Sequence, residues 1–277
     1  MANPSADAVE RPDVRARADG GRLRALALAS APGPASEPLA FLSHLVALQQ
    51  AMADGHARAV LQPDAPFADA IDADAVADAL PSFLAELMRI APPPAAAAAG
   101  RLLDAGLAEW GRLVHAFWRG DRGGDLQRSF ILEALLQPFA EIACASVDVS
   151  ARHASRERLD RCPVCGDEPV VAILRDAAHG ARRSLACGLC LAEWPAPRLV
   201  CAACGEEAFA KLAVHRADEY PAARVDTCET CRTYVKTIDM TRDATSVPIV
   251  DDIATVALDL WAREQGYRRL RPNLLRL

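Results

Sequence analysis

Residues 162–166 read Cys162-Pro163-Val164-Cys165-Gly166, and residues 201–205 repeat the pattern as Cys201-Ala202-Ala203-Cys204-Gly205. Two more Cys-x-x-Cys pairs lie close by, within residues 187–190 and 228–231. Two intervening residues let the chain turn so that both sulfurs face one tetrahedral ion, and a following glycine supplies the positive φ that such a turn often needs. Eight of the nine cysteines therefore form a pattern that is typical of metal ligands.

The distances between the pairs along the chain assign them to two sites. There are 21 residues between Cys165 and Cys187 and 23 between Cys204 and Cys228, each enough for a β-hairpin that brings two turns together. We expect two four-cysteine sites, made by Cys162, Cys165, Cys187 and Cys190 in the first and by Cys201, Cys204, Cys228 and Cys231 in the second. The alternative is an interleaved arrangement in which the two middle pairs, only ten residues apart, share an ion.

Four sulfur ligands favour a tetrahedral ion, and this geometry suits both Zn and Fe. A closed four-sulfur site has no open position for water or substrate, so its expected role is to stabilise a small fold. Redox exchange of the thioredoxin kind is a competing interpretation of the first pair, but it needs a helix N-terminus, whereas Gly166, Asp167 and Glu168 follow the pair. The ninth cysteine, Cys144, lies in an apolar run and is expected to be a buried, inert thiol.

The first half of the chain shows apolar residues at helical spacing, beginning with a helix over residues 38–52. Three more helices are expected, over residues 70–90 with an interruption at Pro81, over 102–118, and over 130–147 with a kink at Pro138. Residues 91–94 and 120–124 are expected to be connectors, and residues 1–37 a mostly disordered tail.

The second half changes to short segments between Cys, Gly and Pro, of which residues 170–174 and 198–200 predict strands. After Pro248 a last helix is expected, with Asp251 or Asp252 as its N-cap and Gly266 as its C-terminal stop. The apolar face of this helix implies that it packs back on the body of the protein.

The composition favours a soluble, folded protein of 277 residues, 52% of them apolar. The net charge is −6, and eleven Lys and Arg stand against twelve Asp and Glu over residues 161–250, so nucleic acid is disfavoured as a partner. The longest apolar stretch near the N-terminus, residues 25–31, is far shorter than the roughly 20 residues of a membrane span. Without an export signal, the cysteines are better interpreted as metal ligands than as disulfides.

Other residues offer no catalytic constellation. His153, His179 and His215 lie near the cysteine pairs, but eight sulfurs already satisfy two tetrahedral sites. The sequence contains no P-loop ending, nucleophile elbow or His-Glu-x-x-His motif. A self-contained enzyme is therefore not expected.

The cysteine half resembles the FdhE family, accessory proteins for the biogenesis of formate dehydrogenase. The resemblance covers about residues 161–273. It is carried by the four cysteine pairs together with Glu193, Trp194, Arg198, Arg224 and the segments 234–236 (Tyr-Val-Lys), 251–254 (Asp-Asp-Ile-Ala), 258–260 (Leu-Asp-Leu) and 264–269 (Glu-Gln-Gly-Tyr-Arg-Arg). The first half is similar to the family in length and helix content.

The resemblance implies an α+β fold with a helical N-terminal domain, two tandem rubredoxin-like or zinc-ribbon modules and a C-terminal helix. The expected divisions are a tail at 1–37, a helical domain at 38–155, a first ribbon at 156–197, a second ribbon at 198–247, and a helix and tail at 248–277. Two Fe or Zn ions per chain are implied, with iron the ion proposed for the family.

The resemblance also implies a function. The expected protein is a cytoplasmic chaperone, not an enzyme, that binds the catalytic (alpha) subunit of respiratory formate dehydrogenase and is needed for its activation. No nucleic acid and no membrane insertion are expected, and a homodimer is compatible with the sequence. The alternatives are a thiol-disulfide oxidoreductase and a nucleic-acid-binding zinc-ribbon protein.

Overall fold

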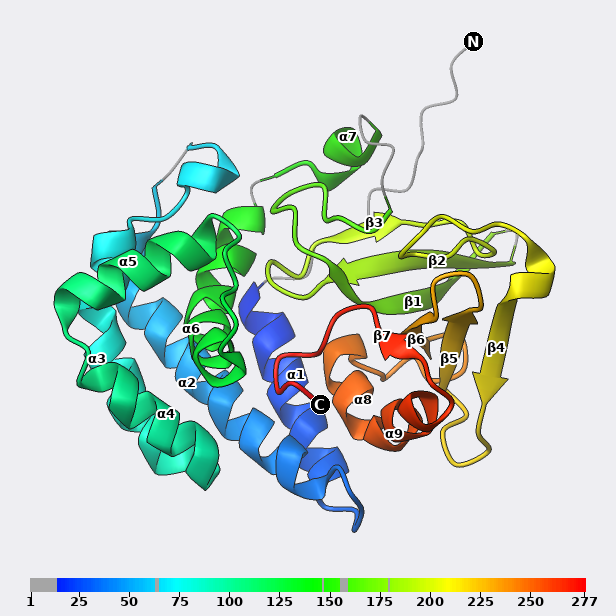
Figure 1. Cartoon of the computed structure of the whole chain (residues 1–277), viewed down its shortest axis with the longest axis horizontal. Helices are drawn as coiled ribbons and strands as arrows, with labels where there is room; N and C mark the ends of the chain where they lie inside the picture. Colours follow the sequence, from blue (N-terminus) through cyan, green and yellow to red (C-terminus); the bar gives the residue numbers. More distant parts are fainter. Residues whose placement is uncertain (1–13, 63–64, 146, 155–158, 179) are drawn as a thin grey trace.

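The computed structural model describes residues 14–62, 65–145, 147–154, 159–178 and 180–277. Helices fill the first part of the chain and one sheet fills the second, with the last two helices packed on that sheet (Figure 1). In the part of the chain that the structure describes, no helix has both the length and the apolar character that a bilayer span needs.

The first part contains seven described helices: α1 (Val14–Ala29), α2 (Ser36–Val60), α3 (Ala73–Ile90), α4 (Pro93–Leu103), α5 (Leu107–Trp118), α6 (Leu126–Ala145) and α7 (Val149–Ala154). Helix α2 buries Leu39, Leu42 and Leu45, the apolar spacing that predicts it. Helix α6 is buried on every side along residues 129–141, as expected for the central helix of a bundle.

The helical part differs from the sequence prediction at three places. Helix α4 begins within the triple proline, because proline is tolerated in the first turn of a helix. A break before α5 divides the predicted helix 102–118, where Gly106 has φ +83°. Helix α3 continues through Pro81, where the sequence predicts an interruption, since buried apolar side chains on both sides hold the helix together. Helix α6 spans Pro138, as the predicted helix over 130–147 does.

The expectation of a disordered tail is wrong for residues 14–37, where α1 and the start of α2 are helical; residues 1–13 lie outside the described part. Distant contacts hold α1 in place. Arg24 donates to Asp251 (2.6 Å) and Asp243 (2.9 Å), more than 200 residues later in the sequence. Arg17 pairs with Glu141 of α6 at 2.8 Å. Such partners cannot be recognised from local sequence.

The seven-stranded sheet is built from two similar meanders in the order β3-β2-β1-β6-β5-β4, with β7 also paired to β6. Its strands are β1 (Pro169–Ala177), β2 (Gly180–Cys187), β3 (Glu193–Pro195), β4 (Leu212–Arg216), β5 (Ala223–Cys228), β6 (Thr233–Asp239) and β7 (Arg268–Arg269). Strands β1 and β6 join the meanders in parallel. The predicted strand over 198–200 is instead a turn that links them.

The two faces of the sheet pack against different parts of the molecule. Val171 and Ile173 of β1 face a core shared with the last helix, whereas Ala172 between them faces the core shared with the helical bundle. This alternation follows from the two-residue period of a strand.

The last helix of the prediction is divided into α8 (Pro248–Ala254) and α9 (Val256–Glu264), separated at Thr255. Asp251 and Asp252 lie inside α8 and are not N-caps, because Pro248 begins the helix and both carboxylates bind distant cations. Gly266 has φ +77° just after α9, as expected for a helix end.

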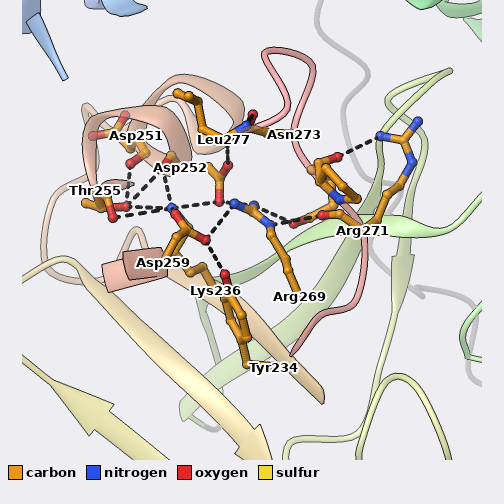
Figure 2. Close-up of polar contacts among 12 residues, drawn as sticks. Tyr234, Lys236, Asp251, Asp252, Thr255, Asp259, Arg269, Arg271, Asn273 and Leu277 are labelled. Carbon is orange, nitrogen blue, oxygen red and sulfur yellow. Dashed lines mark hydrogen bonds and ion pairs between the residues drawn. The ribbon is translucent and has the colours of Figure 1, made fainter. Parts of the chain in front are cut away.

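A buried cluster of ions joins α8, α9, β6 and β7 (Figure 2). Lys236 contacts Asp259 at 2.5 Å and Asp252 at 3.2 Å. Arg269 bridges the same two carboxylates, at 2.6 Å to Asp252 and 2.7 Å to Asp259. Tyr234 donates its hydroxyl to Asp259 at 2.8 Å. Two buried cations thus balance two buried carboxylates.

We predict that Lys236→Met lowers the free energy of unfolding by about 3–5 kcal/mol, because it leaves two buried carboxylates with one cation. Lys211→Met is the matched control, since Lys211 is the chain's other lysine and is exposed beside Glu206 at 3.9 Å. The control should change stability by less than about 1 kcal/mol. Equal urea midpoints for the two variants would contradict a structural role for the cluster.

We predict a pH-dependent effect of Glu141→Gln. Burial raises the pKa of Glu141 from its ordinary 4.5 to about 7. The folded state therefore holds this proton more tightly, and the stability it contributes is full below pH 4.5 and lost as pH rises through about 7. Urea unfolding should show the glutamine variant close to the wild type at pH 5 and more stable by up to about 3 kcal/mol at pH 8. A difference that is constant with pH would refute this.

Candidate metal centres

All four Cys-x-x-Cys turns share one backbone conformation. The residue after the second cysteine is left-handed in each, with φ of +78° at Gly166, +54° at Leu191, +76° at Gly205 and +54° at Arg232. In three turns the amide two residues after the first cysteine points at its sulfur, at 3.3–3.4 Å. Each turn therefore directs both of its sulfurs to the same side. Two of the turns have the predicted glycine at this position; the other two have Leu191 and Arg232, for which a left-handed backbone is strained.

The structure brings the eight cysteines together in the two groups that the spacing predicted, and not in the interleaved arrangement. Within each group the four sulfurs lie within 4.8 Å of one another. The closest pairs join opposite turns: Cys162–Cys190 at 3.6 Å, Cys165–Cys187 at 3.4 Å, Cys201–Cys231 at 3.8 Å and Cys204–Cys228 at 3.7 Å.

These distances fit a metal ion. Four sulfurs placed about 2.3 Å from one tetrahedral centre are about 3.8 Å apart. Both groups approach that edge length, and each supplies four ligands of one chemical kind. Each group could therefore hold one Zn or Fe ion.

The two sites differ in exposure. Three cysteines of the first site, Cys162, Cys187 and Cys190, are buried within the core shared with the helical bundle. In the second site Cys204 is exposed and Cys231 is half-buried. The first site is therefore part of the core, whereas the second lies at the surface.

Two family models match adjacent parts of the chain: "FdhE, central domain" over residues 161–198 and "FdhE, C-terminal domain" over residues 199–276. The crystal structure of the FdhE protein from Pseudomonas aeruginosa superimposes with a TM-score of 0.74 and 26% identity, covering 96% of this chain and 97% of that one. The chain belongs to the FdhE family.

Curated FdhE homologues match the sequence of this chain over shorter stretches. The Aquifex aeolicus homologue is 34% identical over 168 residues, 59% of this chain and 56% of that protein. The Serratia proteamaculans homologue is 32% identical over 197 residues, 70% of this chain and 63% of that protein. The sequence match thus spans little more than half of the length of these FdhE relatives.

At the first cysteine site, the C-terminal segment and helix α6 contact the turn formed by residues 187–190. Arg271 contacts Asp167 and Glu133 at 3.0 Å each, and its guanidinium lies so close to Gly188 that a Cβ there would overlap it. Gln137 of α6 donates to the carbonyl of Gly188 at 3.0 Å. A side chain at position 188 would therefore displace the guanidinium of Arg271 from this turn.

Burial also affects the thiols of the first site. In the absence of a metal it raises the pKa of Cys187 and, more strongly, of Cys190. A metal ion must displace these protons to bind, so its apparent affinity rises with pH. Raised pKa values at these two thiols are the opposite of what a reactive redox cysteine requires. In the second group burial opposes, and hydrogen bonds with Thr233 favour, the lowered pKa of Cys231.

Some residues that contact the turns of the two cysteine sites could not be identified from the sequence alone. Arg183 is 97% buried and hydrogen-bonds to the Pro197 carbonyl at 3.0 Å, in the link between the meanders. Arg271 and Gln137 act on the first site from distant segments, and no local motif marks them. In contrast, the segments that carry the family resemblance supply the buried ion cluster, including Lys236 and Asp259.

The histidines near the sites have other contacts. His215 packs on Trp261 with ring centroids 4.7 Å apart and hydrogen-bonds to Thr227 at 3.1 Å. His153 joins neither cysteine group among the residues described, and His179 lies outside them. Cys144 is buried, as predicted, and also lies outside both groups.

We predict that Cys162→Ser and Cys204→Ser each lower the metal content from two ions per chain to about one, measured by elemental analysis of protein purified without oxygen. Cys162→Ser should lower the unfolding temperature more, because its site lies in the core. Cys144→Ser is the control, because Cys144 contacts the thiol of Cys190 but belongs to neither group of four, and it should keep both ions. Unchanged metal content in the first two variants would refute the ligand assignment.

Proposed function

We propose that the chain is a cytoplasmic accessory protein that binds the catalytic subunit of respiratory formate dehydrogenase and supports its maturation. Membership of the FdhE family is the observation that carries this proposal. The match to the Pseudomonas aeruginosa FdhE structure extends over the helical part as well as the sheet, which favours a shared role for the whole chain.

The geometry favours binding over catalysis. Each cysteine group supplies four sulfurs, which fill the coordination sphere of a tetrahedral ion and leave no position for a substrate. A zinc ion would cross-link the turns, and an iron ion would add one-electron redox chemistry. The second cysteine site lies at the surface, so its two turns can form a rigid surface to which a partner binds.

A thiol-disulfide oxidoreductase is the less favoured alternative. Such enzymes lower a thiol pKa at a helix N-terminus. Here a left-handed Gly166 and an extended segment follow Cys165, and burial raises the pKa of Cys187 and Cys190. A nucleic-acid-binding ribbon is also less favoured, because the net charge of −6 opposes contact with phosphates.

We predict that a tagged copy, expressed in its own host with formate dehydrogenase induced, recovers the catalytic subunit of that enzyme. Bound proteins would be identified by mass spectrometry after purification without oxygen. The subunit should be recovered in a cofactor-poor, immature form, because an accessory protein binds before the enzyme is complete.

The control is the same tag on an unrelated protein from the same host. Repeated failure to enrich the catalytic subunit, with the enzyme expressed, would contradict the proposal. Salt-sensitive enrichment of nucleic acid would instead support the ribbon alternative.

A further inference from the structure

A small hollow lies beside the second cysteine site. Its volume is about 70 Å³, and it is lined by Cys201 and Cys228 together with Leu199, Phe209 and Val214. Cofactor pockets commonly measure about 300–1,000 Å³, so this hollow suits one apolar side chain better than a small molecule.

Exposed apolar side chains gather at this hollow. Phe209 is 74% exposed, Leu199 57% and Val214 51%, although each belongs to a residue type that is usually buried. Single exposed apolar residues are common, but three around one hollow form a patch of the kind found at protein interaction sites. Cys228 of the lining lies 3.7 Å, sulfur to sulfur, from the exposed Cys204 of the second cysteine group.

Strand β4 carries part of this patch and forms the outer edge of the sheet. Among the described strands it pairs with β5 alone, and it lies at the end of the sheet far from the helical bundle (Figure 1). His215 faces Trp261 of α9, so its neighbour Val214 points to the opposite face. Because β4 has a partner strand on one side only, the backbone N–H and C=O groups on its other side can bind an added strand, and they lie beside the apolar hollow.

Two arginines of the hollow, Arg183 and Arg198, lack a full set of partners among the described residues. Arg183 lines it and is 97% buried, but its Nε has no hydrogen-bond partner among the described residues. Arg198, at the rim, is exposed, and the described residues offer it no ion-pair partner within 4.0 Å. Asp226, the acidic residue of the lining, pairs with Arg224 at 2.8 Å and with Arg183 at 3.8 Å, which leaves Arg198 as the arginine of the lining without an ion pair among the described residues. A carboxylate from a partner would pair with Arg198, the exposed arginine of the rim.

We propose that the hollow and the edge of β4 receive an extended segment of the client protein. The segment adds a strand to β4, places one apolar side chain in the hollow and sets a neighbouring carboxylate near Arg198. This inference rests on the proposed function, because it names the surface by which the client is bound.

A second copy of the chain is the competing occupant. In a twofold antiparallel pairing of two β4 strands, Val214 would lie opposite its own copy and Arg216 opposite Leu212, and the strand (Leu-Ala-Val-His-Arg) brings no carboxylate for Arg198. An extended client segment that carries a carboxylate supplies that partner.

The test compares the double variant Phe209→Glu/Val214→Glu with Leu107→Glu in the full chain. Leu107 is 56% exposed and lies on α5, away from the sheet. Recovery of the formate dehydrogenase catalytic subunit should fall at least about tenfold for the double variant, as loss of a central apolar contact predicts, and stay unchanged for Leu107→Glu. Both variants should keep two metal ions and the wild-type circular dichroism, because the changed side chains are exposed.

A photocrosslinking residue at position 209 provides a second measurement, with position 107 as its control. Crosslinks from 209 to the catalytic subunit support the proposal. Crosslinks from 209 only to another copy of this chain overturn it in favour of a dimer. If the wild type recovers the subunit and the folded double variant recovers it equally, this surface is wrong while the proposed function stands. If the wild type recovers no catalytic subunit, the proposed function itself fails.

Discussion

Closure of four sulfurs around one point is the constraint on which the sheet depends. Each group makes two turns, more than 20 residues apart, meet at the base of a hairpin, and thereby fixes where the strands pair. Cys187 lies opposite Pro169 at the start of β1, and Cys228 lies opposite Leu212 at the start of β4. A metal ion bound by each group would cross-link the base of its hairpin, and its binding free energy would then add to the stability of the sheet.

The C-terminal segment provides the second constraint, because it connects the cysteine half to the helical half. Arg269 ties β7 to α8 and α9 through two buried carboxylates. Two residues later, Arg271 reaches both the first metal site and Glu133 of the central helix α6. Arg269 and Arg271 thus connect the helical bundle to the sheet through buried ion pairs. The second cysteine group lies in the other meander, and its Cys204 is exposed.

The sequence predicted the features that depend on residues close together along the chain. The Cys-x-x-Cys spacing gave both four-sulfur groups and their hairpins, since the ligands of each group lie in one short stretch of chain. Helix α2 followed from apolar periodicity. What was missed depends on contacts between distant residues: α1 is ordered by Arg24 with Asp251, and the parallel join of β1 and β6 has no signal within either strand. Arg271 and Arg183 were missed for the same reason, because each acts on a turn far from itself.

The most direct test of the central claim is X-ray absorption at the metal edge of the full chain purified without oxygen from its own host. Two ions per chain, each surrounded by four sulfurs at about 2.3 Å, is the predicted result. The spectrum would also identify the ion as iron or zinc. A well-folded protein with eight free thiols and no bound metal, or with nitrogen and oxygen ligands in place of sulfur, would contradict it.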